Sequence, residues 1–324
     1  MAQVGSHFCV LDICKSPTLL GGGRRDGCAE MDDELQEVRD NFYVGNYQKC
    51  LQMCETTTAS NDVAQSELLA TLARCYLSLS LSDKLRQMPG SECPGHKATV
   101  FMAILMRGKE ASKPAAKEKL LALAKETQDM SCAMLAAIAL AMDGSWTEAV
   151  QMTKVHPTQE MQALCVFFYL GCNQVAQAEK KLQEMAGNND DSAAFRLATA
   201  ALKQATGDPE EAYLTYCDLS TQFPCAEGDD SGSVLLLTGK ALANMQRKMF
   251  TEAVEDLTRA FQTQPKNADI LVNLCCCMTH LGKRDEFQKY YALLEQEAPA
   301  HPYVVKTQSV RNVFVRFKSS LDAA

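Results

Sequence analysis

The sequence predicts an all-α protein in which helix hairpins stack side by side into a solenoid. The first observation is a regular recurrence of small residues, which fall at Ala149, Ala178, Ala212 and Ala253, with Phe287 at the next such position. The steps between these positions are 29, 34, 41 and 34 residues. The second observation is that the intervening apolar residues recur at helical spacing and are separated by turn signals.

The third observation is a proline near the end of each later unit, at Pro224, Pro265 and Pro299. A 34-residue period closed by proline is typical of tetratricopeptide repeats, each of which contributes two antiparallel helices. The predicted fold is therefore a tetratricopeptide-like α-α superhelix. Because such a stack presents a long curved surface, it favours binding over catalysis.

Three parts are predicted along the chain. Residues 1–30 contain Gly21-Gly22-Gly23 and show little periodicity, which predicts a flexible N-terminal extension. Residues 31–301 carry the hairpins and form the solenoid. Residues 302–324 are predicted as a C-terminal capping helix, because the last apolar face of a stack needs a cover. Its apolar residues include Val304, Val310, Val313, Phe314 and Phe317.

The N-terminal hairpins of the solenoid are irregular. Asp32-Asp33-Glu34 provides carboxylates that favour a helix start, and Gly45-Asn46 predicts the turn between the first two helices. The next strong helix runs over Leu68–Leu77, but its partner is weak and ends near Pro89. We expect a loop over residues 89–95 and then a pair of helices over 97–107 and 115–126.

From residue 130 onward the repeat register is clear. A helix through Met134 and Ala141 leads through Asp143-Gly144-Ser145 into a short helix over Trp146–Thr153. Seven residues inserted in the loop 225–233 account for the 41-residue step. The later hairpins are predicted to pair residues 159–171 with 175–186, 193–206 with 209–222, 234–246 with 250–263, and 268–281 with 284–297.

Small residues are expected where paired helices cross closely. A long side chain at such a crossing overpacks the contact, which costs roughly 1–3 kcal/mol. The predicted repeat-packing positions are Ala149, Ala178, Ala212, Ala241, Ala253, Ala260 and Cys275.

A second set of residues falls near first-helix positions that usually line the concave face of such a stack. We predict that these residues contact a protein partner, because large apolar side chains are the usual anchors of interfaces. The set consists of Phe42, Tyr43, Met134, Ile138, Phe167 and Leu170.

Composition excludes several classes of function. The net charge is −8, and no dense cluster of Lys and Arg occurs, which argues against nucleic-acid binding. No stretch approaches the roughly 18–20 apolar residues of a membrane span, so direct membrane insertion is not expected. The 15 cysteines are odd in number and no secretory signal is visible, which favours reduced thiols and a cytoplasmic location.

No catalytic, cofactor or metal site is predicted. The segment from Gly90 to Lys97 resembles a phosphate loop, but no strand precedes it and no Ser or Thr follows its lysine. Cys277 with His280, and Cys50 with Cys54, have metal-like spacing, but neither pair has the second pair that structural zinc requires. Helix packing is the preferred interpretation of both pairs.

The ordered motifs of the chain resemble the coatomer epsilon-subunit family. The resemblance extends from about Asp33 to the C-terminus, and each motif alone is weak. The motifs are Asp33-Glu34-Leu35, Asn41-Phe42-Tyr43-Val44-Gly45-Asn46-Tyr47-Gln48-Lys49-Cys50, Leu197-Ala198-Thr199-Ala200, Val234–Ala243, Ile270-Leu271-Val272-Asn273-Leu274 and His280-Leu281-Gly282-Lys283.

The resemblance implies a non-enzymatic subunit of the COPI vesicle coat without cofactors. It implies an array that curls around the C-terminal domain of the alpha coatomer subunit and supports retrograde Golgi-to-ER and intra-Golgi transport. It also implies a cytoplasmic protein that lies peripherally on Golgi membranes and COPI vesicles through the coat. The Pro-interrupted segment 89–114, the long N-terminal extension and the many cysteines depart from the family and leave open how tightly the N-terminal repeats curl.

Two alternatives are a generic tetratricopeptide scaffold and a co-chaperone adaptor. A co-chaperone clamp grips a C-terminal carboxylate with Lys, Asn and Arg at defined first-helix positions. Here those positions hold Thr238 and Leu242, and only Asn273 is suitable. A carboxylate-binding groove without cations lacks its main attraction, so the co-chaperone interpretation is the weaker one.

Overall fold

A computed structural model describes residues 35–88, 92–186, 191–225 and 232–322. Every regular element in these ranges is helical, which confirms the predicted all-α class of stacked helix pairs. The predicted extension over residues 1–30 lies outside the described residues. The chain forms two compact units that divide between Leu236 and Leu237, inside the region predicted as one solenoid.

Unit 1 begins its described part with α2 and ends in the first turn of α14. Successive helices pair as hairpins, and the first helices of neighbouring hairpins also pack against each other, as in α4 with α6 and α6 with α8. Its helices are α2 (Gln36–Tyr43), α3 (Tyr47–Thr56), α4 (Asp62–Ser78), α5 (Ser82–Gln87), α6 (Pro94–Arg107), α7 (Lys113–Glu126), α8 (Met130–Met142), α9 (Trp146–Thr153), α10 (Gln159–Gly171), α11 (Val175–Met185), α12 (Ala193–Thr206) and α13 (Pro209–Gln222).

Unit 2 contains most of α14 (Val234–Gln246), then α15 (Phe250–Thr263), α16 (Ala268–His280), α17 (Arg284–Glu297) and α18 (Pro302–Asp322). Each of α15, α16 and α17 packs against the helix that follows or precedes it in the chain. The core of unit 2 includes Leu257 and Leu294, which have no exposed surface. Unit 2 therefore follows the nearest-neighbour packing that is typical of a solenoid.

Local sequence signals explain where the helices begin and end. The side chains of Asp129, Thr158 and Ser192 each accept a hydrogen bond from a backbone N–H in the first turn of α8, α10 and α12. These bonds satisfy N–H groups that have no partner within the helix. Gly207 ends α12 with a φ of +89°, a left-handed conformation that glycine adopts without a steric penalty.

At two prolines the structure corrects a predicted helix start, and the helix predicted over Leu68–Leu77 also begins earlier, at Asp62. Pro94 and Pro114 lie in the first turns of α6 and α7, so these helices begin before the predicted 97 and 115. A proline in the first helical turn is tolerated because its missing N–H would have had no partner there. The predicted loop over 89–95 therefore ends too late, and its residues 89–91 lie outside the described residues.

The seven repeat-packing residues all lie in the core, and none has exposed surface. Three of them lie in unit 1, on α9, α11 and α13. The other four lie on α14, α15 and α16 of unit 2. The set is Ala149, Ala178, Ala212, Ala241, Ala253, Ala260 and Cys275.

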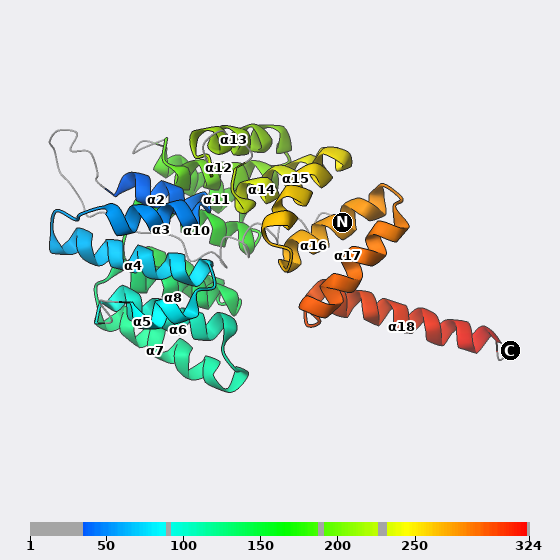
Figure 1. The fold of residues 1–324 in the computed structure, drawn as a ribbon, viewed down its shortest axis with the longest axis horizontal. Helices are drawn as coiled ribbons and strands as arrows, with labels where there is room; N and C mark the ends of the chain where they lie inside the picture. Colours follow the sequence, from blue (N-terminus) through cyan, green and yellow to red (C-terminus); the bar gives the residue numbers. More distant parts are fainter. Residues whose placement is uncertain (1–34, 89–91, 187–190, 226–231, 323–324) are drawn as a thin grey trace. The chain divides into compact units, whose positions relative to one another are not determined.

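Unit 1 also contains contacts between residues that are far apart in sequence. Helix α2 packs against α12, and the two appear together in Figure 1. The Asp40 carboxylate accepts a hydrogen bond from the Ala193 N–H (3.0 Å), and the Asn46 side chain donates one to the Phe223 carbonyl oxygen (2.9 Å). Ser233 donates a further bond to the Val44 carbonyl oxygen. Unit 1 therefore closes on itself, in contrast to an open stack of neighbours.

Gly45 makes this closure sterically possible. Its φ is +87°, and a Cβ atom added to it would lie 3.1 Å from Ser233 Oγ and 3.2 Å from Leu235 Cβ. Both the backbone conformation and the close approach of the second segment favour a residue without a side chain. The Gly45-Asn46 turn predicted from sequence thus has a second role, because it allows residues 233–235 to approach α2.

The C-terminal helix is present as predicted, and its first turns pack on α17. Val304 is fully buried, and the Tyr303 ring lies 6.4 Å from the Tyr291 ring of α17, edge to face. Gln308 donates a hydrogen bond to Glu295 of α17 (3.2 Å). From Val310 to Phe317, the apolar side chains of α18 are exposed. The predicted capping role therefore applies to the start of α18 and is wrong for this later stretch.

Candidate protein interface

The six residues predicted to contact a partner lie on α2, α8 and α10, and the structure places all of them in the core of unit 1. The exposed fraction of each side chain is 8% or less. The members are Phe42, Tyr43, Met134, Ile138, Phe167 and Leu170. The expectation that they form an open apolar face is therefore wrong.

The physical reason differs between the helices. Helix α8 packs against α6, α7 and α9, and every residue from Ser131 to Ala141 is buried. A helix that is apolar on all sides has no face left for solvent. Helix α2 is enclosed because unit 1 closes on itself, so its concave positions meet other parts of the same chain. The almost wholly apolar composition of residues 130–142 indicates a helix that is buried on all sides. The repeat register instead led to the prediction that Met134 and Ile138 line an open face.

Phe42 shows how completely these positions are satisfied within the chain. The Arg74 guanidinium lies over its ring, 5.0 Å from the centroid, and the Tyr47 ring lies 5.3 Å away. Arg74 is 1% exposed and donates hydrogen bonds to Thr71 Oγ1 (2.7 Å) and the Ala70 carbonyl oxygen (3.2 Å). A buried guanidinium with these partners stabilises the position of the aromatic ring.

Buried charges also lie between α2, α4 and α10. Arg39 pairs with Glu67 at 2.6 Å (Nε to Oε1), and both side chains are almost completely buried. Burial raises the pKa of Glu160 to about 7, although the positive charge of Arg39 opposes this shift. Glu160 therefore changes its charge near neutral pH, inside the core that closes unit 1.

Three cysteines meet beside Arg74. The thiols of Cys50, Cys54 and Cys75 interact with one another, and Cys50 also donates to the Val38 carbonyl oxygen (3.4 Å). Hydrogen bonds from Cys50 and Cys75, with help from the Arg74 charge, hold the pKa of Cys54 well below its ordinary value. In the other metal-like pair, Cys277 with His280, the His280 ring stacks on Phe250, with 4.2 Å between the ring centroids. Within the described ranges, no three His, Cys, Asp or Glu side chains are arranged to hold a metal ion.

An exposed apolar face does occur on α18. Its four residues recur at helical spacing on one side of the helix, and we call them the α18 apolar face: Val310, Val313, Phe314 and Phe317. Their exposed fractions range from 58% to 70%. Exposed Lys306, Arg311 and Arg316 give the same helix a basic character in a protein of net charge −8. The sequence showed these apolar residues, but the capping interpretation assigned them to the core.

A comparison with protein families decides which protein class this arrangement belongs to. The model of the coatomer epsilon subunit family matches residues 31–322, which is most of the chain. The chain belongs to the coatomer epsilon subunit family. As a member of this family it is a non-enzymatic part of the COPI coat.

Curated relatives agree with this family along nearly their whole length. The chain is 28% identical to coatomer subunit epsilon-2 of Arabidopsis thaliana over 293 residues, covering 88% of this chain and 95% of that one. It is 24% identical to the coatomer subunit epsilon of Caenorhabditis elegans over 300 residues, covering 89% and 99%. These relatives are coatomer epsilon subunits, so the predicted resemblance to this family is confirmed.

Solved structures agree with the fold of this coatomer epsilon subunit. A tetratricopeptide repeat protein from Parabacteroides merdae aligns with a TM-score of 0.53 at 14% identity, covering 81% of this chain and 96% of that one. The Cut9–Hcn1 hetero-tetramer of APC/C aligns with a TM-score of 0.55 at 11% identity, covering 86% and 55%. Among the described residues, no helix is long and apolar enough to cross a membrane.

Proposed function

We propose that this coat protein binds the C-terminal domain of the alpha coatomer subunit and supports retrograde Golgi-to-ER and intra-Golgi vesicle transport. In this role it is cytoplasmic and reaches Golgi membranes and COPI vesicles through the assembled coat. Membership of the coatomer epsilon subunit family supports the proposal. The single observation that carries the binding surface is the α18 apolar face.

Apolar side chains arranged in this way are typical of a helix that docks into a partner's groove. Val310, Phe314 and Phe317 follow the i, i+4, i+7 spacing of such helices, with Val313 beside them. Large exposed aromatic residues are uncommon on a protein that works alone, and they are frequent anchors at interfaces. Because the six apolar residues of unit 1 are buried, α18 offers the better contact surface for the alpha subunit.

The proposal predicts a specific loss of binding when the α18 apolar face becomes charged. We expect Phe314→Asp combined with Phe317→Asp to weaken capture by the C-terminal domain of the alpha coatomer protein at least a hundredfold. The matched control is Val305→Asp with Val315→Asp, two exposed valines on other sides of the same helix. The control should bind within about threefold of the unmutated protein, since rim and off-interface positions carry little binding energy.

Affinity is measured by titration of the purified full-length protein, and circular dichroism verifies that each variant keeps its helices. Unchanged binding by a folded Phe314/Phe317 variant would remove α18 from the interface. Failure of the unmutated protein to bind any C-terminal fragment of the alpha subunit would overturn the proposed contact itself.

The co-chaperone alternative has no support in the site geometry. Thr238, Leu242 and Asn273 occupy the positions where a carboxylate clamp would need accessible polar side chains. All three are buried, with exposed fractions of 9% or less. A buried residue cannot contact the terminal carboxylate of a partner, so we do not propose this function.

A further inference from the structure

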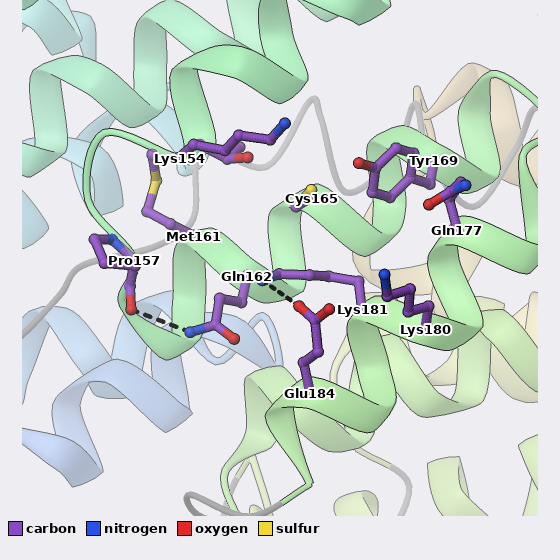
Figure 2. Close-up of a pocket in the computed structure, with 11 residues that line it drawn as sticks. Lys154, Pro157, Met161, Gln162, Cys165, Tyr169, Gln177, Lys180, Lys181 and Glu184 are labelled. Atoms are coloured by element: carbon purple, nitrogen blue, oxygen red, sulfur yellow. Dashed lines mark hydrogen bonds and ion pairs between the residues drawn. The ribbon is translucent and has the colours of Figure 1, made fainter.

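A pocket in unit 1 lies between the end of α9, α10 and α11 (Figure 2). It is a cavity of about 280 Å³, open to solvent on one side. Met161 and Cys165 of α10 lie at its base and are buried, and Tyr169 follows one turn later. Three lysines are also among the lining residues: Lys154, Lys180 and Lys181.

The three lysines are not equivalent. Lys181 pairs with Glu184 one turn later on α11 (3.1 Å), so its charge is largely compensated. Lys154 and Lys180 are exposed, and neither ammonium group has a hydrogen bond or ion pair within the described part of the chain. Two uncompensated positive charges at the walls of a cavity attract a carboxylate or another anion.

The pocket also contains groups that suit a peptide. The side-chain amide of Gln177 lines it and has no hydrogen-bond partner within the described residues, so it can pair with a peptide group. Figure 2 shows the Tyr169 hydroxyl directed toward Cys165, with the Lys180 ammonium on the same side as Gln177. Met161 and Cys165 offer an apolar base for a neighbouring side chain.

The electrostatics of Cys165 show that the positive charges of Lys154 and Lys181 both reach the base of the pocket. Burial raises the pKa of the Cys165 thiol, whereas the positive charges of Lys181 and Lys154 both act to lower it. The two lysines come from different helical hairpins, so their convergence is a product of the fold. A charged group placed beside Cys165 would therefore interact with both lysine charges.

Phosphate-bearing ligands fit this pocket less well. Phosphate sites favour arginine, whose planar fork binds two oxygens at once, and no arginine lines this cavity. Glu184, which also lines the cavity, repels a doubly charged phosphate group more strongly than it repels a single carboxylate. A carboxylate next to an apolar residue therefore suits this lining better.

We propose that this pocket binds an acidic peptide segment of a protein partner. A Glu or Asp side chain of the segment lies between Lys154 and Lys180, its backbone pairs with Gln177, and an adjacent apolar side chain covers Met161 and Cys165. This surface lies on α9, α10 and α11, whereas the proposed contact with the alpha subunit lies on α18. Either can therefore fail without the other.

The test uses the full-length protein and two fluorescein-labelled peptides, one with the sequence Glu-Leu-Asp-Glu-Leu-Glu and one in which Gln and Asn replace the acidic residues. Fluorescence anisotropy measures binding of both. We expect the acidic peptide to bind at least tenfold more tightly than the neutral one, with an affinity that falls as salt is raised. Carbodiimide cross-linking followed by mass spectrometry should join the acidic peptide to Lys154 or Lys180.

The decisive variant is Lys154→Glu with Lys180→Glu, which should weaken binding of the acidic peptide at least tenfold. The matched control is Lys119→Glu with Lys125→Glu, which makes the same charge change at two exposed positions of α7. The control should change the affinity less than twofold.

Three outcomes would overturn the proposal. The first is no measurable binding of the acidic peptide at millimolar concentration. The second is equal weakening by the pocket variant and the α7 control, because binding would then follow only the net charge. The third is a pocket-dependent affinity for vesicles containing phosphatidylinositol phosphate without affinity for the acidic peptide, which would assign the pocket to a phosphate group.

Discussion

The two units are built from similar hairpins, yet they end differently. In unit 1, hydrogen bonds join α2 and its following turn to residues 193, 223 and 233, which closes the unit on itself. In unit 2, α16 packs against α15 and α17, the start of α18 packs on α17, and α18 leaves an apolar face exposed. Contacts made by α2 and by the turn after it therefore distinguish the closed unit 1 from unit 2.

The two units also differ in whether their large apolar residues are buried or exposed. Unit 1 buries apolar residues that would otherwise line a concave face, together with the charges of Arg39, Glu67 and Glu160. Unit 2 exposes large apolar residues on α18, a helix whose first turns pack on α17. We expect substitutions in unit 1 to act on folding, and substitutions late in α18 to act on assembly.

The largest expected effect is in the core of unit 2. Ala253→Arg places a long cation at a fully buried helix crossing, which combines overpacking with an unsolvated charge. We expect the free energy of unfolding to fall by more than about 3 kcal/mol, measured by urea unfolding. The neighbouring Glu252→Arg is exposed on the same helix and should change it by less than about 0.5 kcal/mol. Similar curves for the two variants would contradict the buried crossing.

The second prediction concerns pH and the closed core of unit 1. Because burial raises the pKa of Glu160 from 4.5 to about 7, the folded protein binds a proton there that the unfolded chain has lost. The stability from this proton is present below pH 4.5 and is lost as the pH rises through 7, by about 3 kcal/mol.

Glu160→Gln should remove this part of the pH dependence and make the protein more stable than wild type at pH 8. Urea unfolding at pH 5, 6, 7 and 8 measures the difference between the two proteins. Glu148→Gln on the exposed side of α9 serves as the control and should keep the wild-type profile. If Glu160→Gln also keeps that profile, its carboxylate does not titrate in the folded core.

The third prediction concerns a variant that disturbs the contact by which unit 1 closes on itself. Gly45→Ala adds a Cβ atom 3.1 Å from Ser233 Oγ at a residue whose φ is +87°. Gly144→Ala has a similar φ of +79°, but an added Cβ meets no atom within 4 Å. We expect a loss of about 1 kcal/mol for Gly144→Ala from the backbone alone, and about 2–3 kcal/mol for Gly45→Ala. Equal losses of stability for the two variants would mean that a Cβ atom at residue 45 does not disturb the packing of residues 233–235.

The smallest expected effect sharpens the contrast within α18. Val304→Ala removes a fully buried side chain and should cost about 2 kcal/mol, because it leaves a cavity beside α17. Val313→Ala removes a side chain that is 62% exposed and should change stability by less than about 0.5 kcal/mol. Thermal unfolding of both variants measures the difference. A large loss for Val313→Ala would show that the α18 apolar face is covered within the chain.

Many helix boundaries were determined by the sequence itself. The helices over 146–153, 193–206, 209–222, 234–246, 250–263 and 284–297 agree with the predicted ranges. Capping residues, glycine turns and helical periodicity act within a few residues, so they can be read from a linear chain. Four of the predicted packing residues were identified by repeat spacing, and all four are fully buried: Ala149, Ala178, Ala212 and Ala253.

The accessible surfaces, in contrast, were decided only by the tertiary structure. Phe42 and Phe167 have the pattern of interface residues but are buried, whereas Phe314 was assigned to a cap and is 70% exposed. Lys154 and Lys180 carry no motif, and they share a pocket only because α9 and α11 lie next to the same helix. Periodicity reports which side of a helix is apolar, but whether that side meets solvent depends on contacts such as Asp40 with Ala193, between residues 153 positions apart.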